Sequence, residues 1–189
     1  ATKQACAAVG QCELMYIYDK LFIEYGYITA QILLTRDITD DEIRKRNVQN
    51  TFERLLDMGA LPIVNENDTV SVDEIEYGDN DTLSAIVAEL VHADALIMMT
   101  DIEGLYNSDP RTDSQAQLIH HVYEITPQIR AKAGGRGSTR GTGGMITKLD
   151  AAQIAMDAGI ISAIINGYDP DNIYRLLSGE QIGTVFWPE

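Results

Sequence analysis

Apolar and polar positions along the chain follow two periods, one typical of helices and one typical of strands. From Thr2 to Tyr25 apolar residues recur every three or four positions, which predicts a helix that ends at Gly26. The stretch 27–35, YITAQILLT, is rich in β-branched and apolar residues and predicts a strand. A second helix is expected next, opened by a capping box over Thr39–Glu42 and ended by Gly59.

The same alternation continues to the end of the chain. Further strands are expected at 61–65, 95–100, 160–167 and 183–188, and further helices at 82–92, 145–159 and 170–179. Strands that are apolar along their whole length are usually covered on both faces, as in parallel sheets. The pattern therefore predicts a three-layer α/β/α sandwich with a mostly parallel central sheet, formed as one domain over residues 1–189.

Composition and charge limit the function classes. The chain has 189 residues, of which 45% are hydrophobic and 23% charged, as expected for a globular domain with a proper core. A net charge of −15 argues against nucleic-acid or anionic-lipid surfaces, because both need a broad basic face. No signal peptide or membrane-spanning run is visible. We therefore expect a cytoplasmic location, with Cys6 and Cys12 as reduced core thiols.

Polar residues follow several of the predicted strands. In parallel α/β sheets ligands bind at the carboxyl ends of the strands. Asn65 and Asp68 lie at the end of one strand and just after it, Thr100 and Asp101 likewise for the next, and Asn166 lies at the end of another. The pair at 100–101 either offers a hydroxyl and a carboxylate to a nucleotide or forms a turn that needs Asp, and the sequence leaves both possibilities open.

A glycine-rich window stands out from the acidic chain. Residues 125–149 contain no Asp or Glu but hold Arg130, Lys132, Arg136, Arg140 and Lys148. Gly143 and Gly144 lack Cβ atoms, so backbone N–H groups can approach an anion closely. The helix that follows adds about half a positive charge at its N-terminus, and Lys148 lies one turn in. The order is not that of a Walker A motif. The window favours a phosphate site, and a flexible surface loop with solvated arginines is the alternative.

Two stretches combine carboxylates with amides, NEND at 65–68 and GDND at 78–81. Carboxylates would hold an ammonium group and amide N–H₂ groups would donate to a carboxylate, which suits a zwitterionic amino acid. Alternatively, Asn80 or Asp81 caps the helix expected from Thr82. Adjacent histidines at 120–121 point apart, so no metal site is expected.

Five stretches together resemble the amino acid kinase family. They are AAVGQ (7–11), PIVNEND (62–68), GDND (78–81), TDIEGLYNSDPR (100–111) and GTGGMITKL (141–149), in the order that the family shows. The fourth is shared by many members, whereas NEND with GDND and TGGM-x-TK is more specific to the branch whose acceptor is glutamate. The resemblance covers essentially the whole chain. The family pattern starts earlier, with a lysine-bearing strand and a serine-bearing loop, which we expect to exist outside this chain.

The resemblance implies transfer of the γ-phosphoryl group of ATP to the side-chain carboxylate of L-glutamate, in proline biosynthesis, with Mg²⁺ bound through the nucleotide phosphates. By this similarity the glutamate pocket is lined by Asn65, Asp68, Asp79 and Asn80. Asp81 would organise the catalytic lysines, and Lys148 would stabilise charge passing between the β- and γ-phosphates. ATP would be held by Thr100, Asp101, Thr142, Gly143, Gly144, Met145, Ile146, Thr147 and Lys148. Feedback inhibition by proline and a homo-oligomer are expected on the same basis.

The implied chemistry agrees with the residue types present. A carboxylate with a pKa of ~4.3 is already ionised at neutral pH, so it needs no general base. Positioning and charge neutralisation are the remaining demands. Two alternatives remain open: another acceptor, such as aspartate, a nucleoside monophosphate or carbamate, and a non-catalytic ligand-binding fragment.

Overall fold

The computed structural model describes residues 2–70, 80–133 and 144–189. The chain forms two compact units, residues 1–80 and residues 81–189. In both units helices pack against parallel strands, so each unit is of the α/β class. The assignment of a single domain to residues 1–189 stays a prediction.

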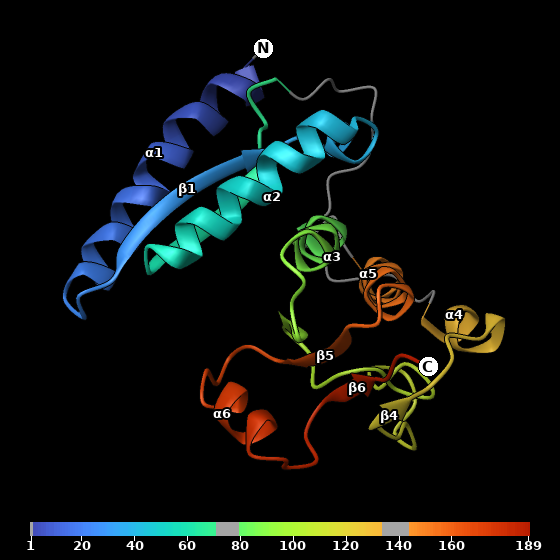
Figure 1. Cartoon of the computed structure of the whole chain (residues 1–189). Helices are drawn as coiled ribbons and strands as arrows, with labels where there is room; N and C mark the ends of the chain where they lie inside the picture. Colours follow the sequence, from blue (N-terminus) through green and yellow to red (C-terminus); the bar gives the residue numbers. More distant parts are fainter. Residues whose placement is uncertain (1, 71–79, 134–143) are drawn as a thin grey trace. The chain divides into compact units, whose positions relative to one another are not determined.

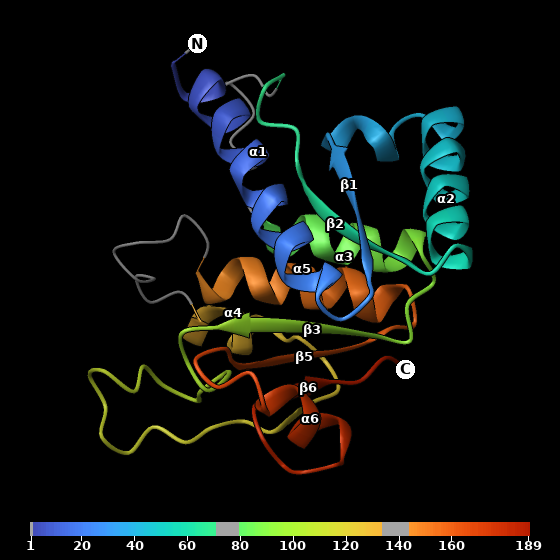
Figure 2. The same cartoon turned by 90° about the vertical axis from the view of Figure 1, so that its left-hand side faces the viewer.

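The first unit is a two-stranded parallel sheet with a helix on each side. Its elements are α1 (Thr2–Ile23), β1 (Ile28–Leu34), η1 (Arg36–Thr39), α2 (Glu42–Asp57) and β2 (Ala60–Glu66). The strands pair in parallel from Ile28↔Ala60 to Leu34↔Glu66. α1 contacts β1 and α2 contacts β2, and the two helices lie on opposite sides of the sheet (Figures 1 and 2).

Two expectations for this unit are wrong. α1 contains no buried residue, and Cys6 and Cys12 on it are exposed rather than core thiols. The capping box at Thr39–Glu42 is not formed either. Asp41 is the N-cap of α2, and its Oδ1 accepts the N–H groups of Ile43 at 2.9 Å and Arg44 at 3.1 Å. An Asp directly before the first helical residue is a strong cap, so the helix begins there.

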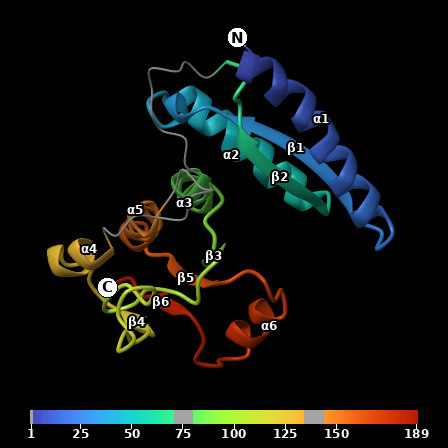
Figure 3. The same ribbon diagram turned by 180° about the vertical axis from the view of Figure 1, so that it is seen from behind.

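The second unit is built on a four-stranded sheet in the order β3-β5-β6-β4. The elements are α3 (Asn80–Leu90), β3 (Ala95–Thr100), β4 (His121–Val122), α4 (Pro127–Ala133), α5 (Met145–Asp157), β5 (Ile161–Asn166), α6 (Asn172–Leu177) and β6 (Thr184–Phe186). β3 and β5 run parallel, and β6 is antiparallel to β5 but parallel to β4. α3 and α5 cover one face of this sheet and α6 the other (Figures 2 and 3). The mostly parallel α/β arrangement predicted from the sequence is thereby confirmed.

The core of the second unit lies between α5 and the sheet. Leu149, Ala151 and Ala152 of α5 are fully buried and pack in one cluster with Ile164 and Phe186. Alanines leave room for the helix backbone to approach the strands closely. Leu149 therefore fixes the rotation of the first turns of α5, and with it the direction of the neighbouring Lys148. None of the helices that the structure describes combines the length and apolar content that crossing a bilayer needs.

Candidate functional site

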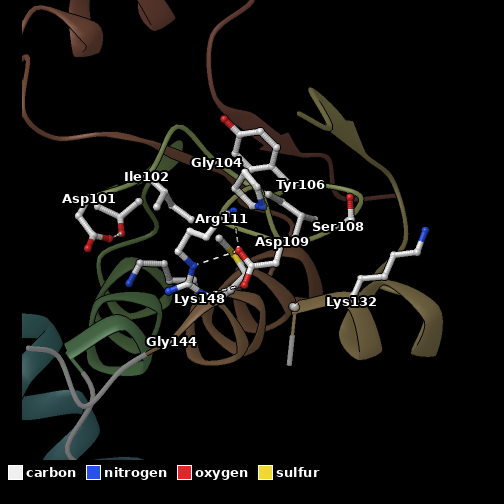
Figure 4. Close-up of a pocket in the computed structure, with 15 residues that line it drawn as sticks. Asp101, Ile102, Gly104, Tyr106, Ser108, Asp109, Arg111, Lys132, Gly144 and Lys148 are labelled. Atoms are coloured by element: carbon white, nitrogen blue, oxygen red, sulfur yellow. Dashed lines mark hydrogen bonds and ion pairs between the residues drawn. The ribbon is translucent and has the colours of Figure 1, made fainter. Parts of the chain in front are cut away.

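A cavity of about 370 Å³ opens at the carboxyl end of β3, in the second unit. Its lining comes from the end of β3 and the loop that follows, from the end of α4 and from the start of α5 (Figure 4). This volume lies in the range of small-molecule sites, and the position is where α/β sheets bind ligands.

The residues predicted to hold ATP fall into three groups. Thr100, Asp101, Gly144, Met145 and Lys148 line the cavity. Ile146 is exposed, and the Thr147 side chain bonds to Asp81 and to the Gly144 carbonyl. Thr142 and Gly143 lie outside the described residues. The structure thus brings together segments that lie more than 40 residues apart, since Thr100 and Gly144 border the same space.

The N-terminus of α5 faces this cavity with its amides uncapped by a side chain. The N-cap is Gly144, and the first turn of the helix carries no acidic residue. The first N–H groups of a helix have no intrahelical acceptor, and with the helix dipole they favour an anion. Lys148 adds a full positive charge one turn further on. The arrangement can bind phosphate oxygens through backbone and side chain together.

Lys148 forms an ion pair with Asp81. Its Nζ lies 2.8 Å from Asp81 Oδ2, and the two side chains are only 13% and 17% exposed. Asp81 belongs to the first turn of α3, and its carboxylate bonds to α5. The capping role that the sequence left open for Asn80 or Asp81 does not fit, because both residues lie inside α3. A pair of this burial holds the lysine ammonium at a fixed place beside the cavity.

A buried hydroxyl anchors the loop that follows β3. Thr184 Oγ1 on β6 accepts the Leu105 N–H at 2.8 Å and donates to the Ile119 carbonyl at 2.6 Å. The approach is close at Gly104, where φ is +157° and an added Cβ would meet Thr184 Oγ1 at 2.7 Å. A glycine is therefore required there, and the wall of the cavity is tied to the last strand.

Arg111 and Lys132 also line the cavity; the sequence gave no role to Arg111 and counted Lys132 among the cations of the glycine-rich window. Arg111 donates to both carboxylate oxygens of Asp109, at 3.0 and 2.9 Å, as the dashed lines in Figure 4 mark. These hydrogen bonds lower the pKa of Asp109 and raise the pKa of Arg111. The pKa of the neighbouring Tyr106 is raised, first by burial and second by the charge of Glu103. The Asp109–Pro110 pair indicates a turn, and it was the feature of the sequence that could have drawn attention to Arg111.

Arg130, the arginine of the glycine-rich window that the structure describes, does not line the cavity. Arg130 on α4 pairs with Asp150 on α5, so its charge is compensated between two helices. Asp150 follows immediately after the acid-free window 125–149, which is why the sequence pattern missed this pairing. Arg136 and Arg140 lie outside the described residues.

Hydrogen bonds between amide side chains connect two of the residues that were predicted to bind the substrate glutamate, Asn65 and Asn80, in the first unit. Asn65 Nδ2 donates to Gln11 Oε1 at 2.9 Å, and Asn80 Nδ2 donates to Asn65 Oδ1 at 3.3 Å. Gln11 had no predicted role, and its buried Nε2 has no partner among the described residues. Asp68 is exposed in the turn after β2, and Asp79 lies outside the described residues.

The two adjacent histidines have separate partners. His120 Nδ1 lies 3.1 Å from the Gly183 carbonyl, whereas His121 Nδ1 accepts the indole N–H of Trp187 at 3.1 Å. In the part of the chain that the structure describes, no three His, Cys, Asp or Glu side chains gather in a way that could hold a metal ion.

Comparison with known proteins identifies the family. The family model described as "Amino acid kinase family" matches residues 1–166. The chain belongs to the amino acid kinase family. Among curated relatives, a protein of Clostridium perfringens named "Glutamate 5-kinase" is 56% identical over 97% of this chain and 70% of its own length. One of Listeria monocytogenes with the same name is 56% identical over 97% of this chain and 68% of its own. The resemblance to the branch whose acceptor is glutamate is confirmed.

Two solved structures share the fold. An isopentenyl phosphate kinase of T. acidophilum has a TM-score of 0.60 at 22% identity, over 94% of this chain and 66% of its own. Uridylate kinase from Archaeoglobus fulgidus has a TM-score of 0.53 at 23% identity, over 73% of this chain and 57% of its own. At this identity the likeness concerns the fold alone. In each comparison this chain spans only part of the relative.

Proposed function

We propose that this protein transfers the γ-phosphoryl group of ATP to the side-chain carboxylate of L-glutamate, which gives L-glutamyl 5-phosphate, the first step of proline biosynthesis. One observation carries the proposal. Lys148 Nζ is held 2.8 Å from Asp81 Oδ2 at the edge of a cavity that also contains Thr100, Asp101 and the N-terminus of α5. A fixed lysine ammonium and a helix N-terminus are groups that a phosphoryl-transfer site needs, because catalysis there depends on positioning and charge stabilisation.

The nucleotide is assigned to the cavity of the second unit. The backbone N–H groups at the start of α5 donate to phosphate oxygens, and Lys148 neutralises the charge that develops between the β- and γ-phosphates. Lys132 places a further positive charge on the lining, whereas the charge of Arg111 is compensated by Asp109. The carboxylate of Asp101 and the hydroxyl of Thr100, which donates to it at 3.2 Å, face the nucleotide.

Oxygen donors at this site suit a hard cation. Thr100 and Asp101 offer a hydroxyl and a carboxylate, which fit Mg²⁺ and its water ligands when the ion enters with ATP through the phosphates. Bound there, Mg²⁺ would supply charge neutralisation on the triphosphate. The task of this chain is to hold Lys148 and the helix amides in place beside it.

The acceptor is assigned to the amide chain of the first unit. Asn65 and Asn80 are bonded to each other, and Gln11 fixes the orientation of Asn65. Amide N–H₂ groups donate to the α-carboxylate of an amino acid, and the carboxylates of Asp68 and Asp79 attract its ammonium group. The side-chain carboxylate of glutamate is ionised at neutral pH and attacks without a base.

Trapping of the acyl phosphate tests the proposal. The full-length protein is incubated with Mg-ATP, hydroxylamine and one acceptor at a time: L-glutamate, L-aspartate, a nucleoside monophosphate or carbamate. We expect ADP release with L-glutamate at a rate at least about tenfold above the other acceptors, together with hydroxamate. A nucleoside monophosphate gives no acyl phosphate, so its phosphorylation is measured through ADP release alone. Turnover of a different acceptor in preference to glutamate would replace the proposed substrate. Binding of ATP and glutamate without any turnover would show a non-catalytic protein.

The family resemblance supports three further proposals. L-proline inhibits by competing at the glutamate site, the protein forms a homo-oligomer, and it works in the cytoplasm, where ATP is available. Proline is expected to raise the KM for glutamate without changing the KM for ATP. Light scattering of the full-length protein measures the mass, and a monomer would contradict the second proposal. Fractionation of the source cells tests the third.

A further inference from the structure

We propose that Thr147 is a positioning residue, whose hydroxyl holds the Asp81 carboxylate in the place from which Asp81 orients Lys148. The inference rests on the proposed function and concerns the same site. Thr147 Oγ1 lies 3.0 Å from Asp81 Oδ2 and 2.8 Å from the Gly144 carbonyl oxygen. Lys148 Nζ lies 2.8 Å from the same Asp81 Oδ2. One carboxylate oxygen is therefore contacted by two consecutive residues of α5.

The chemistry of a hydroxyl decides which contact dominates. Thr147 has one O–H proton, and both Asp81 Oδ2 and the Gly144 oxygen are acceptors, so only one of them receives it at any moment. Hydrogen bonds to an ionised acceptor are stronger than those to a neutral carbonyl. The proton therefore goes mainly to Asp81, and the Gly144 carbonyl is the acceptor that competes for it.

Two donors define the position of the carboxylate better than one. Consecutive residues of a helix point about 100° apart, so Thr147 and Lys148 approach Asp81 Oδ2 from different directions. With both bonds made, the carboxylate cannot rotate without breaking one of them. Without the hydroxyl, the carboxylate would lose one of its two bonds to α5, and the flexible lysine chain would follow a rotation of the carboxylate. The lysine would then lose its fixed approach to the phosphates.

The Thr147 side chain is not part of the nucleotide cavity. The lining includes Gly144, Met145 and Lys148 of the α5 start, but not Thr147. The backbone N–H of Thr147 belongs to the first turn of α5, whose N–H groups can bind an anion. The side chain of Thr147 is directed to Asp81 instead. The residue therefore acts on the reaction through Asp81 and Lys148, not through a side-chain contact with ATP.

Two variants separate the hydroxyl from the shape of the side chain. In the full-length protein Thr147→Val keeps the shape and removes the hydroxyl, and we expect kcat to fall about tenfold, the worth of one charge-assisted hydrogen bond. The KM values for ATP and glutamate are expected to change less than about twofold. Thr147→Ser restores the hydroxyl and is expected to keep kcat within about threefold of the starting protein. A rise in the KM for ATP with kcat unchanged would overturn the inference, because it would show a direct nucleotide contact.

A double-variant cycle tests the route through Asp81. In an Asp81→Asn background the residue that Thr147 positions is already altered, so we expect Thr147→Val to cost less than about twofold in kcat. An undiminished tenfold loss in that background would refute the inference. A role only in stabilising the fold would lower the unfolding temperature and leave the two effects additive.

A spectroscopic measurement keeps the test independent of turnover. While the ion pair is held, the protons of the Lys148 ammonium group exchange slowly enough with water to give a ¹⁵N signal. We expect this signal in the unchanged protein and in Thr147→Ser. It is expected to broaden in Thr147→Val. An unchanged signal in the valine variant would refute the inference. A protein that fails to phosphorylate glutamate would refute the proposed function instead, and the ammonium signal would still decide the role of Thr147.

Discussion

Replacing Thr184 by valine tests how far the nucleotide cavity depends on one buried hydroxyl. The side chain is fully buried on β6, where Oγ1 accepts the Leu105 N–H at 2.8 Å and donates to the Ile119 carbonyl at 2.6 Å. Valine has nearly the same shape, so packing is kept. The N–H and the carbonyl both lose their partner, and no water can replace a hydroxyl at a site without exposed surface.

The size of the effect follows from burial. An unsatisfied buried group costs about 1–3 kcal/mol, and the Leu105 N–H belongs to a residue only 2% exposed, so its cost lies in the upper part of that range. Ile119 is only partly buried, so its carbonyl adds less. We expect a loss of about 3 kcal/mol in the free energy of unfolding of the second unit. For this unit of 109 residues (81–189), with an unfolding entropy of about 2.1 cal/mol/K per residue, that corresponds to about 13 °C in Tm.

Thermal unfolding followed by circular dichroism measures this loss, with Thr184→Ser as the matched control that keeps the hydroxyl. The KM for ATP is expected to rise in the valine variant, because Leu105 and Tyr106 line the cavity. The serine control should stay within about 1 kcal/mol of the unchanged protein. A valine variant as stable as the serine variant would show that the hydroxyl does not anchor the loop.

Three further changes probe the charges and amides of the site. Lys148→Ala is expected to lower kcat about a thousandfold with a small change in glutamate affinity, and steady-state kinetics that show equal activity would remove Lys148 from the mechanism. Asn65→Ala is expected to raise the KM for glutamate about tenfold and to leave the KM for ATP unchanged, since it breaks the bond to Gln11; an opposite pattern would assign the amides to the nucleotide. Arg111→Gln removes the guanidinium bonds and charge that lower the pKa of Asp109 but keeps the backbone N–H of residue 111, so this pKa should rise part of the way to its ordinary value in an NMR titration. Because pairing favours the ionised form, its stabilising effect is present above the unfolded-state pKa and is lost as pH falls through the lowered one. An unmoved titration would contradict the pairing.

Periodicity predicted the longer elements because their burial is regular. β3 and β5 are apolar along their length and pair in parallel, as the runs at 95–100 and 160–167 indicated. The same reasoning located Thr100 and Asp101 at the carboxyl end of a strand, where the structure has them. β4 escaped prediction because it has two residues, and α4 because its seven residues give no readable period.

Contacts between distant segments left no local signal. The bond from Asn65 to Gln11 joins residues 54 positions apart, and that from Lys148 to Asp81 joins residues 67 apart. The family resemblance supplied a role for Lys148 and Asp81 but none for Gln11. The cap of α2 was missed for a different reason. Thr39 and Asp41 are both good capping residues, and Asp41 is the cap because Thr39 is the last residue of η1.

The bond between Leu105 and Thr184 also bears on how the protein is made. The two residues are 79 positions apart, so the amide of Leu105 leaves the ribosome long before its acceptor is synthesised. During that interval the Gly104–Tyr106 stretch of the nascent chain has no β6 to pack against, and closing so long a loop is slow. Nucleotide can therefore assist folding of this unit only at a late stage of translation, after the segment that carries Thr184 has emerged.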